Sequence, residues 1–352
     1  MKIALAVSPL PGLRVGEVHS LVRDTWLSRR RDDHVCSRPV SDAVAMPYVG
    51  SGAEDVLAGD NSETVELGEA GERHFAYRAG TALLLDYTQI LYGIPQEGAS
   101  QSSHIVGRDL AWALREGISE VHIVLPIPGC VSDLGMGILE ELGGLDAARE
   151  ALAPMSIQVL VPGEQRLLGL GGVARSWIAH GLDPEAAQRF ENTFSEIVAG
   201  IPVRSTGLPL LGTGGGPERS IYAGCGGGIA YVLGLLGAQI LPIGDVCIDP
   251  MRGEIEDSDL FVYVCGHIGE DLPSGLLAGS RVAASRGVPV VVIYDSGALR
   301  KGELARLGLN GAYEIRPERA FATGEATTEE LADLPERLHS LVGRVARTWG
   351  WN

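Results

Sequence analysis

The sequence contains very little lysine and has few positive charges overall. Of its 352 residues 28 are lysine or arginine, and Lys2 and Lys301 are the two lysines. A reaction that needs a lysine therefore has at most two candidate residues, and any other positively charged side chain at a site must be an arginine. The 45 acidic residues set the net charge at −17. This charge argues against a nucleic acid or an anionic membrane as partner, because both require a basic face.

Cysteine is also scarce, and its spacing excludes two common structural devices. The five cysteines are odd in number and form no CxxC pair, which argues against a disulfide framework and against a zinc site. Residues 1–7 lack the length and cleavage pattern of a signal peptide. We therefore expect a protein of the reducing cytoplasm.

One long uncharged segment resembles a membrane span in length but not in composition. It extends from Ser220 to Gly244 and holds seven glycines between Gly224 and Gly244, together with Pro242. No basic cluster flanks it. We interpret it as a glycine turn, a buried helix and a short strand.

Apolar strands alternate with amphipathic helices at both ends of the chain. This alternation predicts a parallel sheet with helices on both faces. The strands are expected at 2–7, 260–265, 288–294 and 312–315, and the helices at 17–27, 276–285 and 329–349. We therefore predict an α/β fold of two domains: 1–61 plus 236–352 form a parallel-sheet domain, and 62–235 form an inserted α/β domain.

The inserted domain carries its own strand and helix signals. A hairpin is expected around Ala79 and Gly80, and further strands at 121–125 and 157–161. Asp183 is a plausible N-cap for a helix that begins at Pro184.

The glycine-rich segment 224–228 is the strongest local motif. Glycines that precede a helix can expose backbone N–H groups to a phosphate, so Gly226, Gly227 and Gly228 are candidates for nucleotide binding. The alternative is a tight turn where helix and sheet approach closely. The second glycine run, 212–216, is interpreted as a flexible loop.

Two polar loops follow predicted strands, where ligands of α/β proteins often bind. In the first, Asp133 is a candidate ligand for a metal or a hydroxyl and Ser132 a candidate donor, although Asp133 could equally cap the next helix. The second contains His267, Glu270 and Asp271, which can perform acid–base or metal chemistry, or can simply form a polar loop before a helix. No GxSxG elbow supports serine hydrolysis.

Taken in order, these segments resemble the bacterial glycerate kinase family, whose members combine a flavodoxin-like domain with an inserted α/β domain. The similarity is distant and runs nearly end to end. It rests on the segments 102–107, 129–137, 167–174, 181–199, 224–230, 259–266, 277–279 and 288–294.

The resemblance implies a phosphotransferase that uses ATP with Mg²⁺ to phosphorylate D-glycerate or a related small hydroxy acid. It implies catalytic roles for Asp133, Glu270 and Asp271 and leaves the metal ligands unknown. The implied substrate-binding residues are Asp86, Ser103, Ser132, Gln165, Arg166 and Arg281, and the implied nucleotide-binding residues are Gly226, Gly227, Gly228, Gly266 and His267. The partners are a nucleotide and a hydroxy acid, and a homodimer is one assembly to test.

Several charged positions of the family are replaced here. The segment 6–12 lacks the family's aspartate and lysine, and Ser280, followed by Arg281, stands where a second lysine is usual. Losing a cation that stabilises only transition-state charge typically costs about 10²–10³-fold in rate. Three hypotheses stay open: a kinase, an inactive relative that binds or regulates, and another carboxylate- or phosphate-binding enzyme. For the kinase, Asp133→Ala is expected to abolish turnover and leave the fold intact.

Overall fold

The chain folds into two compact units, which this computed structural model describes at residues 1–59, 61–68, 73–96, 102–201, 216–269, 272–297, 299, 302, 304–319 and 326–350. One unit comprises Met1–Leu57 and Pro242–Asn352, and the other comprises Ala58–Leu241. The second unit is thus an insertion into the first. The sequence predicted this insertion with the bounds 62–235.

The first unit contains a five-stranded sheet in which every neighbouring pair is parallel. Its spatial order is β11 (Gly311–Glu314), β10 (Val290–Gly297), β9 (Leu260–Ile268), β1 (Lys2–Val7) and β2 (His34–Pro39). Numbered along the chain within this unit, the order is 2-1-3-4-5, the flavodoxin-like arrangement. The predicted fold class, α/β with a split parallel-sheet domain, is confirmed.

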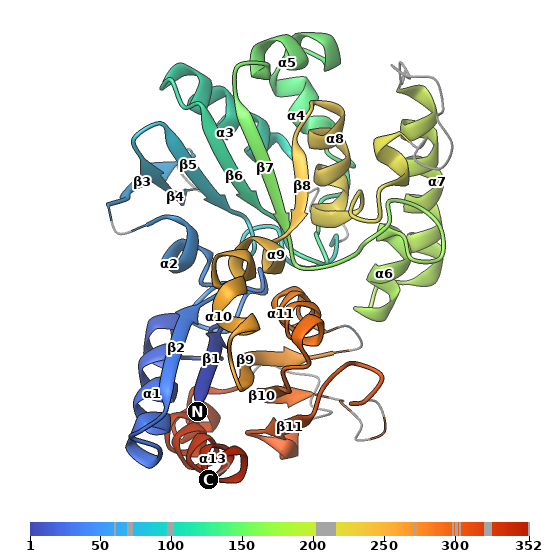
Figure 1. Ribbon diagram of the computed structural model, residues 1–352. Coiled ribbons are helices and arrows are strands. Elements are labelled where there is room, and N and C mark those ends of the chain that lie inside the picture. The colour runs from blue at the N-terminus through green and yellow to red at the C-terminus, as the bar shows by residue number, and fades with distance from the viewer. Residues whose placement is uncertain are drawn as a thin grey trace. The chain divides into compact units, whose positions relative to one another are not determined.

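Helices cover both faces of this sheet, which explains its nearly continuous apolar strands (Figure 1). The helices α1 (Val15–Arg29) and α13 (Leu334–Trp349) pack on each other and share one core with β1, β9 and β10. On the opposite side lie α9 (Ile243–Ile248), α10 (Arg252–Glu256) and α11 (Ser274–Arg286).

The C-terminal helix differs from its prediction in one respect. The sequence predicted a single helix over 329–349, whereas the structure has a short α12 (Thr328–Leu331) followed by α13. Pro335 in the first turn of α13 lacks an N–H, and its ring would clash with the carbonyl of Leu331 in a continuous helix. The break therefore precedes this proline.

The second unit contains a six-stranded mixed sheet. Its order is β3 (Glu63–Leu67), β4 (His74–Ala79), β5 (Ala82–Asp86), β6 (Glu120–Val124), β7 (Ser156–Val161) and β8 (Gln239–Pro242). The pairs β3–β4 and β4–β5 are antiparallel, whereas β5–β6 and β6–β7 are parallel. The predicted hairpin at Ala79 and Gly80 is confirmed, and Gly80 has φ +64°.

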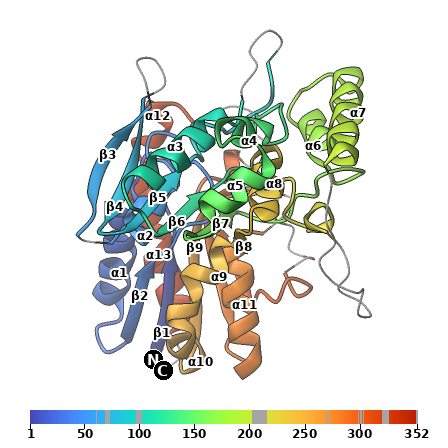
Figure 2. The ribbon, with the colours of Figure 1, turned by 90° about the horizontal axis from the view of Figure 1, so that it is seen from above.

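Seven helices complete the described part of this fold. They are α2 (Ala53–Leu57) in the first unit and, in the second, α3 (His104–Arg115), α4 (Met136–Glu141), α5 (Leu145–Leu152), α6 (Val173–Ala179), α7 (Pro184–Gly200) and α8 (Ile229–Leu235). Figure 2 shows α6 and α7 side by side at one end of the second unit. The carboxylate of Asp183 accepts a hydrogen bond from the amide of Ala186 at 2.9 Å, which confirms the predicted cap of α7.

The long uncharged segment is neither a single helix nor apolar throughout. It divides into a turn at Cys225–Gly228, the buried helix α8 and the short strand β8, as the sequence predicted. Among the residues that the structure describes, no helix combines the length and the apolar character needed to cross a bilayer.

Candidate functional site

The loops after β5, β6 and β7 carry most of the predicted site residues of the second unit. Because these three strands are parallel, the loops that follow them emerge at the same edge of the sheet. Asp86 ends β5, the segment 129–135 follows β6, and Gln165 and Arg166 follow β7. Carboxyl ends of parallel strands are the usual place for ligands in α/β folds. We call this set of residues the β5–β7 edge.

Asp133 receives more hydrogen bonds than any other predicted site residue of this edge. Its Oδ2 accepts from the hydroxyl of Ser102 at 2.5 Å, from the amide of Ser103 at 2.8 Å and from the hydroxyl of Ser103 at 3.1 Å. The amides of Gly135 at 3.0 Å and Gly137 at 3.3 Å also donate to this carboxylate. These bonds join the starts of α3 and α4, so the cap that the sequence left as an alternative is present.

Ser103 is fully buried beneath this carboxylate. Its hydroxyl donates to Asp133 and accepts from the amide of Ile138 at 3.3 Å. A hydroxyl with no exposed surface and two protein partners holds the two helices together, which differs from the predicted contact with substrate.

The residue after Asp133 adopts an uncommon backbone conformation. Leu134 has φ +55°, in the left-handed region that is costly for a side chain of this size. Such conformations cost on the order of 1–3 kcal/mol and cluster at functional sites. The surrounding hydrogen bonds of Asp133 offset this cost and fix the path of the loop.

The glycine turn at 226–228 is filled by the protein's own backbone. All three glycines have positive φ, from +65° to +98°. The amides of Gly226 and Gly228 donate to the carbonyls of Pro126 and Gly224. A Cβ on Gly227 would lie 2.7 Å from the carbonyl oxygen of Val131. Close packing therefore explains these glycines, and nucleotide binding by them stays a prediction.

Gln165 and Arg166 each keep a polar group without a partner among the described residues of the β5–β7 edge. Gln165 is 4% exposed, and its Nε2 donates to the hydroxyl of Ser176 at 2.9 Å. Its Oε1 is buried and has no hydrogen-bond partner in the part of the chain that the structure describes. Arg166 is exposed and makes no ion pair with any residue that the structure describes. Gln165 thus keeps a buried acceptor without a described donor, and the next residue in the chain, Arg166, presents an exposed cation.

Asp86 and Ser132 are also at this edge. Asp86 Oδ1 accepts from the amide of Thr88 at 2.9 Å and from its hydroxyl at 2.6 Å, which closes a turn after β5. Ser132 is half-buried in the loop that leads to Asp133. The structure thus brings Asp86, Ser132, Asp133 and the pair 165–166 to one edge of one sheet.

The first unit has a buried polar cluster that the sequence did not predict. Asp42 follows β2 and is 5% exposed, and the hydroxyl of Tyr263 in β9 donates to its Oδ1 at 2.6 Å. Burial raises the pKa of Asp42, although Tyr263, Ser8 and the amide of Gly275 donate to it and lower that pKa in part. The cluster lies where the strand order reverses between β1 and β9, the point where ligands of such folds bind.

The signal for Asp42 is weak in the sequence. A Ser41-Asp42 pair after a strand would mark it, but β2 carries polar residues at half of its positions and was not predicted as a strand. Ala43 has φ +53° directly after Asp42. Both units therefore place a left-handed non-glycine residue after an aspartate at the carboxyl edge of their sheet.

The predicted residues of the first unit are distributed over several positions. Gly266 and His267 lie within β9; a Cβ on Gly266 would meet the side chain of Met46, whereas His267 is exposed and lies 3.4 Å from the hydroxyl of Ser296. Glu270 and Asp271 lie outside the described residues, as do 212–215 of the second glycine run. Their roles stay predictions.

Arg281 is engaged with a neighbouring helix. It lies in the second half of α11 and pairs with Asp245 of α9 at 2.5 Å, and its side chain is 68% exposed. Because α11 begins after the carboxyl end of β9 and runs back along the sheet, Arg281 lies away from that edge. Substrate binding by Arg281 stays a prediction that this pairing does not favour.

The two buried thiols near the β5–β7 edge are unsuited to nucleophilic chemistry. Burial raises the pKa of Cys130 to about 11, and it raises the pKa of Cys225 further still. Both thiols stay protonated at neutral pH, and the thiolate is the reactive form.

A resident metal site of several protein ligands is not found among the described residues, where no group of three or more histidine, cysteine or carboxylate side chains converges. Mg²⁺ in phosphotransferases is commonly held by substrate phosphates with one or two carboxylates.

The comparisons with known proteins identify the fold. No family model matches this chain. Two uncharacterized proteins, from Mycobacterium bovis and Mycobacterium tuberculosis, are each 28% identical over 353 residues, which cover 95% of this chain and 87% of theirs. The crystal structure of a "putative glycerate kinase 2" from Salmonella typhimurium LT2 superposes with a TM-score of 0.68 at 18% identity and covers 99% of this chain and 98% of that one. Over its full length, this chain therefore has the two-domain fold of that protein.

Proposed function

We propose that this protein transfers a phosphoryl group from MgATP to D-glycerate or to a related small hydroxy acid. The observation that carries the proposal is the pair Gln165 and Arg166 at the β5–β7 edge, within a fold shared end to end with the "putative glycerate kinase 2" of Salmonella typhimurium LT2. A hydroxy acid presents the two groups that this pair complements, a carboxylate and a hydroxyl.

Each polar group of the pair has a distinct role in the proposal. The Arg166 guanidinium binds the substrate carboxylate through two parallel hydrogen bonds, which its planar fork favours. The Gln165 Oε1, a buried acceptor without a partner among the described residues, accepts a hydrogen bond from a water that a substrate hydroxyl holds, because its burial keeps the substrate from direct contact. Phosphoryl transfer depends mainly on positioning and charge neutralisation, so a site of this kind can be sufficient.

Asp133 acts in this proposal as a positioning residue. Its hydrogen bonds to 102, 103, 135 and 137 hold the loop that carries Ser132, which in turn lies at the same edge as Gln165. A carboxylate with so many protein donors has little capacity left to bind a metal or to accept a substrate proton. This role differs from the catalytic one that the family resemblance implied.

The experiment is a steady-state assay of ADP release with D-glycerate and with other small hydroxy acids. Arg166→Gln is expected to raise the KM for the hydroxy acid by about 10–100-fold, the loss of one charged hydrogen-bonding group. The KM for MgATP is expected to change little. Arg189→Gln, an exposed arginine of α7, is the matched control and should behave as the natural protein does.

A second candidate function is non-catalytic binding or regulation. The positions of the two lysines favour this function. Lys2 begins β1, at the end of the strand opposite the carboxyl edge of the sheet, and Lys301 lies outside the described residues. The amides of Gly226 and Gly228 already donate to backbone carbonyls, which favours non-catalytic binding as well. Calorimetry with MgATP, with and without D-glycerate, separates the two functions: no detectable heat at millimolar nucleotide supports the binding protein, and tight binding supports the kinase.

A further inference from the structure

The orientation of the Gln165 amide is set by a serine of the neighbouring helix. Gln165 Nε2 donates to the hydroxyl of Ser176 in α6 at 2.9 Å. The Ser176 hydroxyl lies 2.7 Å from the backbone carbonyl oxygen of Val173, three residues earlier in the same helix. These groups form a chain of two hydrogen bonds that ends on the backbone of α6.

The proton count fixes the direction of this chain. A carbonyl oxygen carries no proton, so the hydrogen bond to Val173 uses the single proton of the Ser176 hydroxyl. Ser176 can then only accept from Gln165, and the Gln165 amide must turn its NH2 group toward Ser176. The other end of the amide, Oε1, therefore faces away from Ser176 and is the acceptor without a partner among the described residues.

The backbone of Gln165 leaves the side chain little other freedom. Its N–H donates to the carbonyl of Ile221 and its carbonyl accepts from the amide of Gly224, each at 2.8 Å. The residue is 4% exposed, so its side chain is enclosed as well. The motion that remains is a half-turn of the terminal amide, which exchanges Oε1 and Nε2 with little change in shape. The hydrogen bond to Ser176 opposes this half-turn.

Helix α6 is a firm support for Ser176, because the next residue anchors it on two sides. The indole N–H of Trp177 donates to the carbonyl of Gly129, in the loop after β6, at 2.9 Å. Its fully buried ring meets those of Phe190 and Phe194 in α7, with centroids 5.2 and 5.9 Å away. Consecutive residues of α6 thus hold the loops that follow β6 and β7.

We propose that Ser176 is a positioning residue, which locks the Gln165 amide so that Oε1 is the group presented to a ligand. This inference rests on the proposed function, in which Oε1 accepts from a water that the substrate hydroxyl holds. A water that donates to Oε1 keeps both of its lone pairs for the substrate hydroxyl, whereas a water that accepts from a flipped Nε2 keeps one. The locked amide therefore favours a ligand that donates a hydrogen bond, as a hydroxy acid does.

The first test observes the Gln165 amide directly, by nuclear magnetic resonance of the full chain without substrate. Its side-chain NH2 signals are identified by their absence in Gln165→Ala. Ser176→Ala is expected to speed the hydrogen exchange of these protons by about 2–10-fold, the loss of one neutral hydrogen bond. Ser176→Thr should keep the natural rate, because a helical threonine hydroxyl also bonds the carbonyl three or four residues earlier. An unchanged rate in Ser176→Ala would overturn the proposal.

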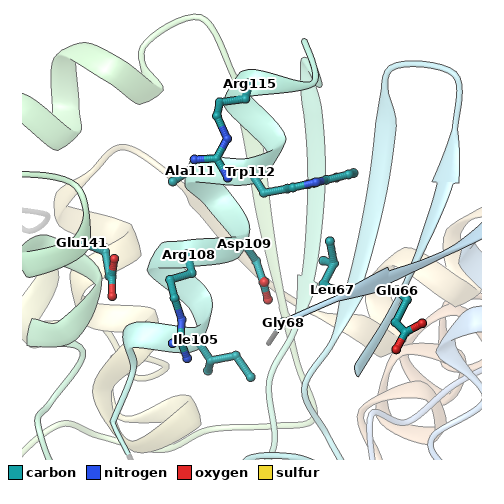
Figure 3. A pocket seen from close by; sticks show the side chains of 10 residues that line it. All are labelled: Glu66, Leu67, Gly68, Ile105, Arg108, Asp109, Ala111, Trp112, Arg115 and Glu141. Carbon is teal, nitrogen blue, oxygen red and sulfur yellow. The ribbon is translucent and has the colours of Figure 1, made fainter. Parts of the chain in front are cut away.

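Two variants serve as controls for this measurement. Ser195 in α7 donates to the carbonyl of Glu191 at 2.8 Å, the same kind of bond within a helix, at an exposed position. Ser195→Ala should leave the exchange of the Gln165 amide unchanged. Arg115 lines a separate cavity of about 410 Å³ beside α3, where Figure 3 shows its guanidinium group and that of Arg108 at opposite ends. Arg115→Gln should also leave the exchange rate unchanged.

The second test determines whether the locked amide matters for the substrate, in the assay of ADP release. Ser176→Ala should raise the KM for the hydroxy acid by about 2–10-fold and leave the KM for MgATP unchanged. In a Gln165→Ala background the same substitution should have no further effect, because Ser176 acts through Gln165. An equal loss in both backgrounds would show a merely structural role and overturn the proposal. If no hydroxy acid is turned over, the proposed function fails, and the exchange measurement alone decides whether Ser176 locks the amide.

Discussion

Asp133 Oδ2 accepts a hydrogen bond from the backbone amide of Ser103 across 2.8 Å, although thirty residues separate them in the chain. The same carboxylate receives the amides of Gly135 and Gly137 at the start of α4. One side chain therefore caps the beginnings of two helices. Three of its bonds come from backbone amides, whose loss would leave buried donors without partners.

Asp133→Ala is therefore expected to destabilise the fold, which revises the expectation that it would leave the fold intact. We expect a loss of about 2–4 kcal/mol in the free energy of unfolding, since hydrogen bonds to a charged group are worth about 1.5–3 kcal/mol and several are lost together. Urea unfolding followed by circular dichroism measures this. Asp133→Asn keeps one acceptor oxygen and should lose less; equal stability of Asp133→Ala and the natural protein would refute the capping role.

Gly129 is expected to tolerate no side chain. A Cβ there would overlap the backbone of Gly226 and Gly227, which cannot move without breaking the glycine turn. Gly129→Ala should cost at least about 1–3 kcal/mol, the usual effect of overpacking. Gly163→Ala is the matched control at the same edge, because a Cβ there meets no atom within 4 Å. If thermal unfolding showed the two variants to be equally stable, the close packing would not constrain the turn.

The buried pair Arg316 and Asp295 is expected to stabilise the first unit. Arg316 Nε and Nη2 donate to the two carboxylate oxygens of Asp295 at 2.6 and 2.5 Å, and both side chains are at most 3% exposed. Asp295→Ala should cost about 3–5 kcal/mol, because it leaves an unpaired buried charge.

The exposed pair of Arg281 and Asp245 is the comparison for that experiment. Arg281→Gln should change the free energy of unfolding by no more than about 1 kcal/mol, since solvent screens an exposed pair. Chemical denaturation of both variants tests the contrast. A loss of several kcal/mol in Arg281→Gln, or none in Asp295→Ala, would contradict it.

Because of Asp42, the free energy of unfolding is expected to fall as the pH rises from about 3.8, the ordinary pKa of an aspartate. Burial raises the pKa of Asp42 in the folded state, so between the unfolded and folded pKa values the folded protein binds more protons than the unfolded chain. Stability that protonated Asp42 contributes is therefore complete below 3.8 and is lost as pH rises through the folded pKa.

Asp42→Asn removes this titration. The difference in unfolding free energy between Asp42→Asn and the natural protein should grow in favour of the variant from pH 4 upward and then level off, since the amide needs no deprotonation. Chemical denaturation at a series of pH values measures it. A difference independent of pH would show that Asp42 titrates normally in the folded protein.

Local sequence patterns were sufficient to predict an element where all of its residues are buried alike. The strand β1 (Lys2–Val7) was predictable because a sheet covered on both faces needs an unbroken apolar run. The cap at Asp183 was predictable because an N-cap bonds to an amide three residues away. The strand β2 was not, because it lies at the edge of its sheet and carries exposed polar residues that break the pattern.

The sequence by itself determined the fold class, the alternation of strands and helices, and the glycine turn before α8. Only the tertiary structure decided the strand order, the partners of Asp133, the unsatisfied Oε1 of Gln165 and the burial of Asp42. The physical reason is the distance along the chain over which each interaction acts. Periodicity and capping act over one or two helical turns, whereas the hydrogen bonds that give a carboxylate its role come from residues thirty or two hundred positions away.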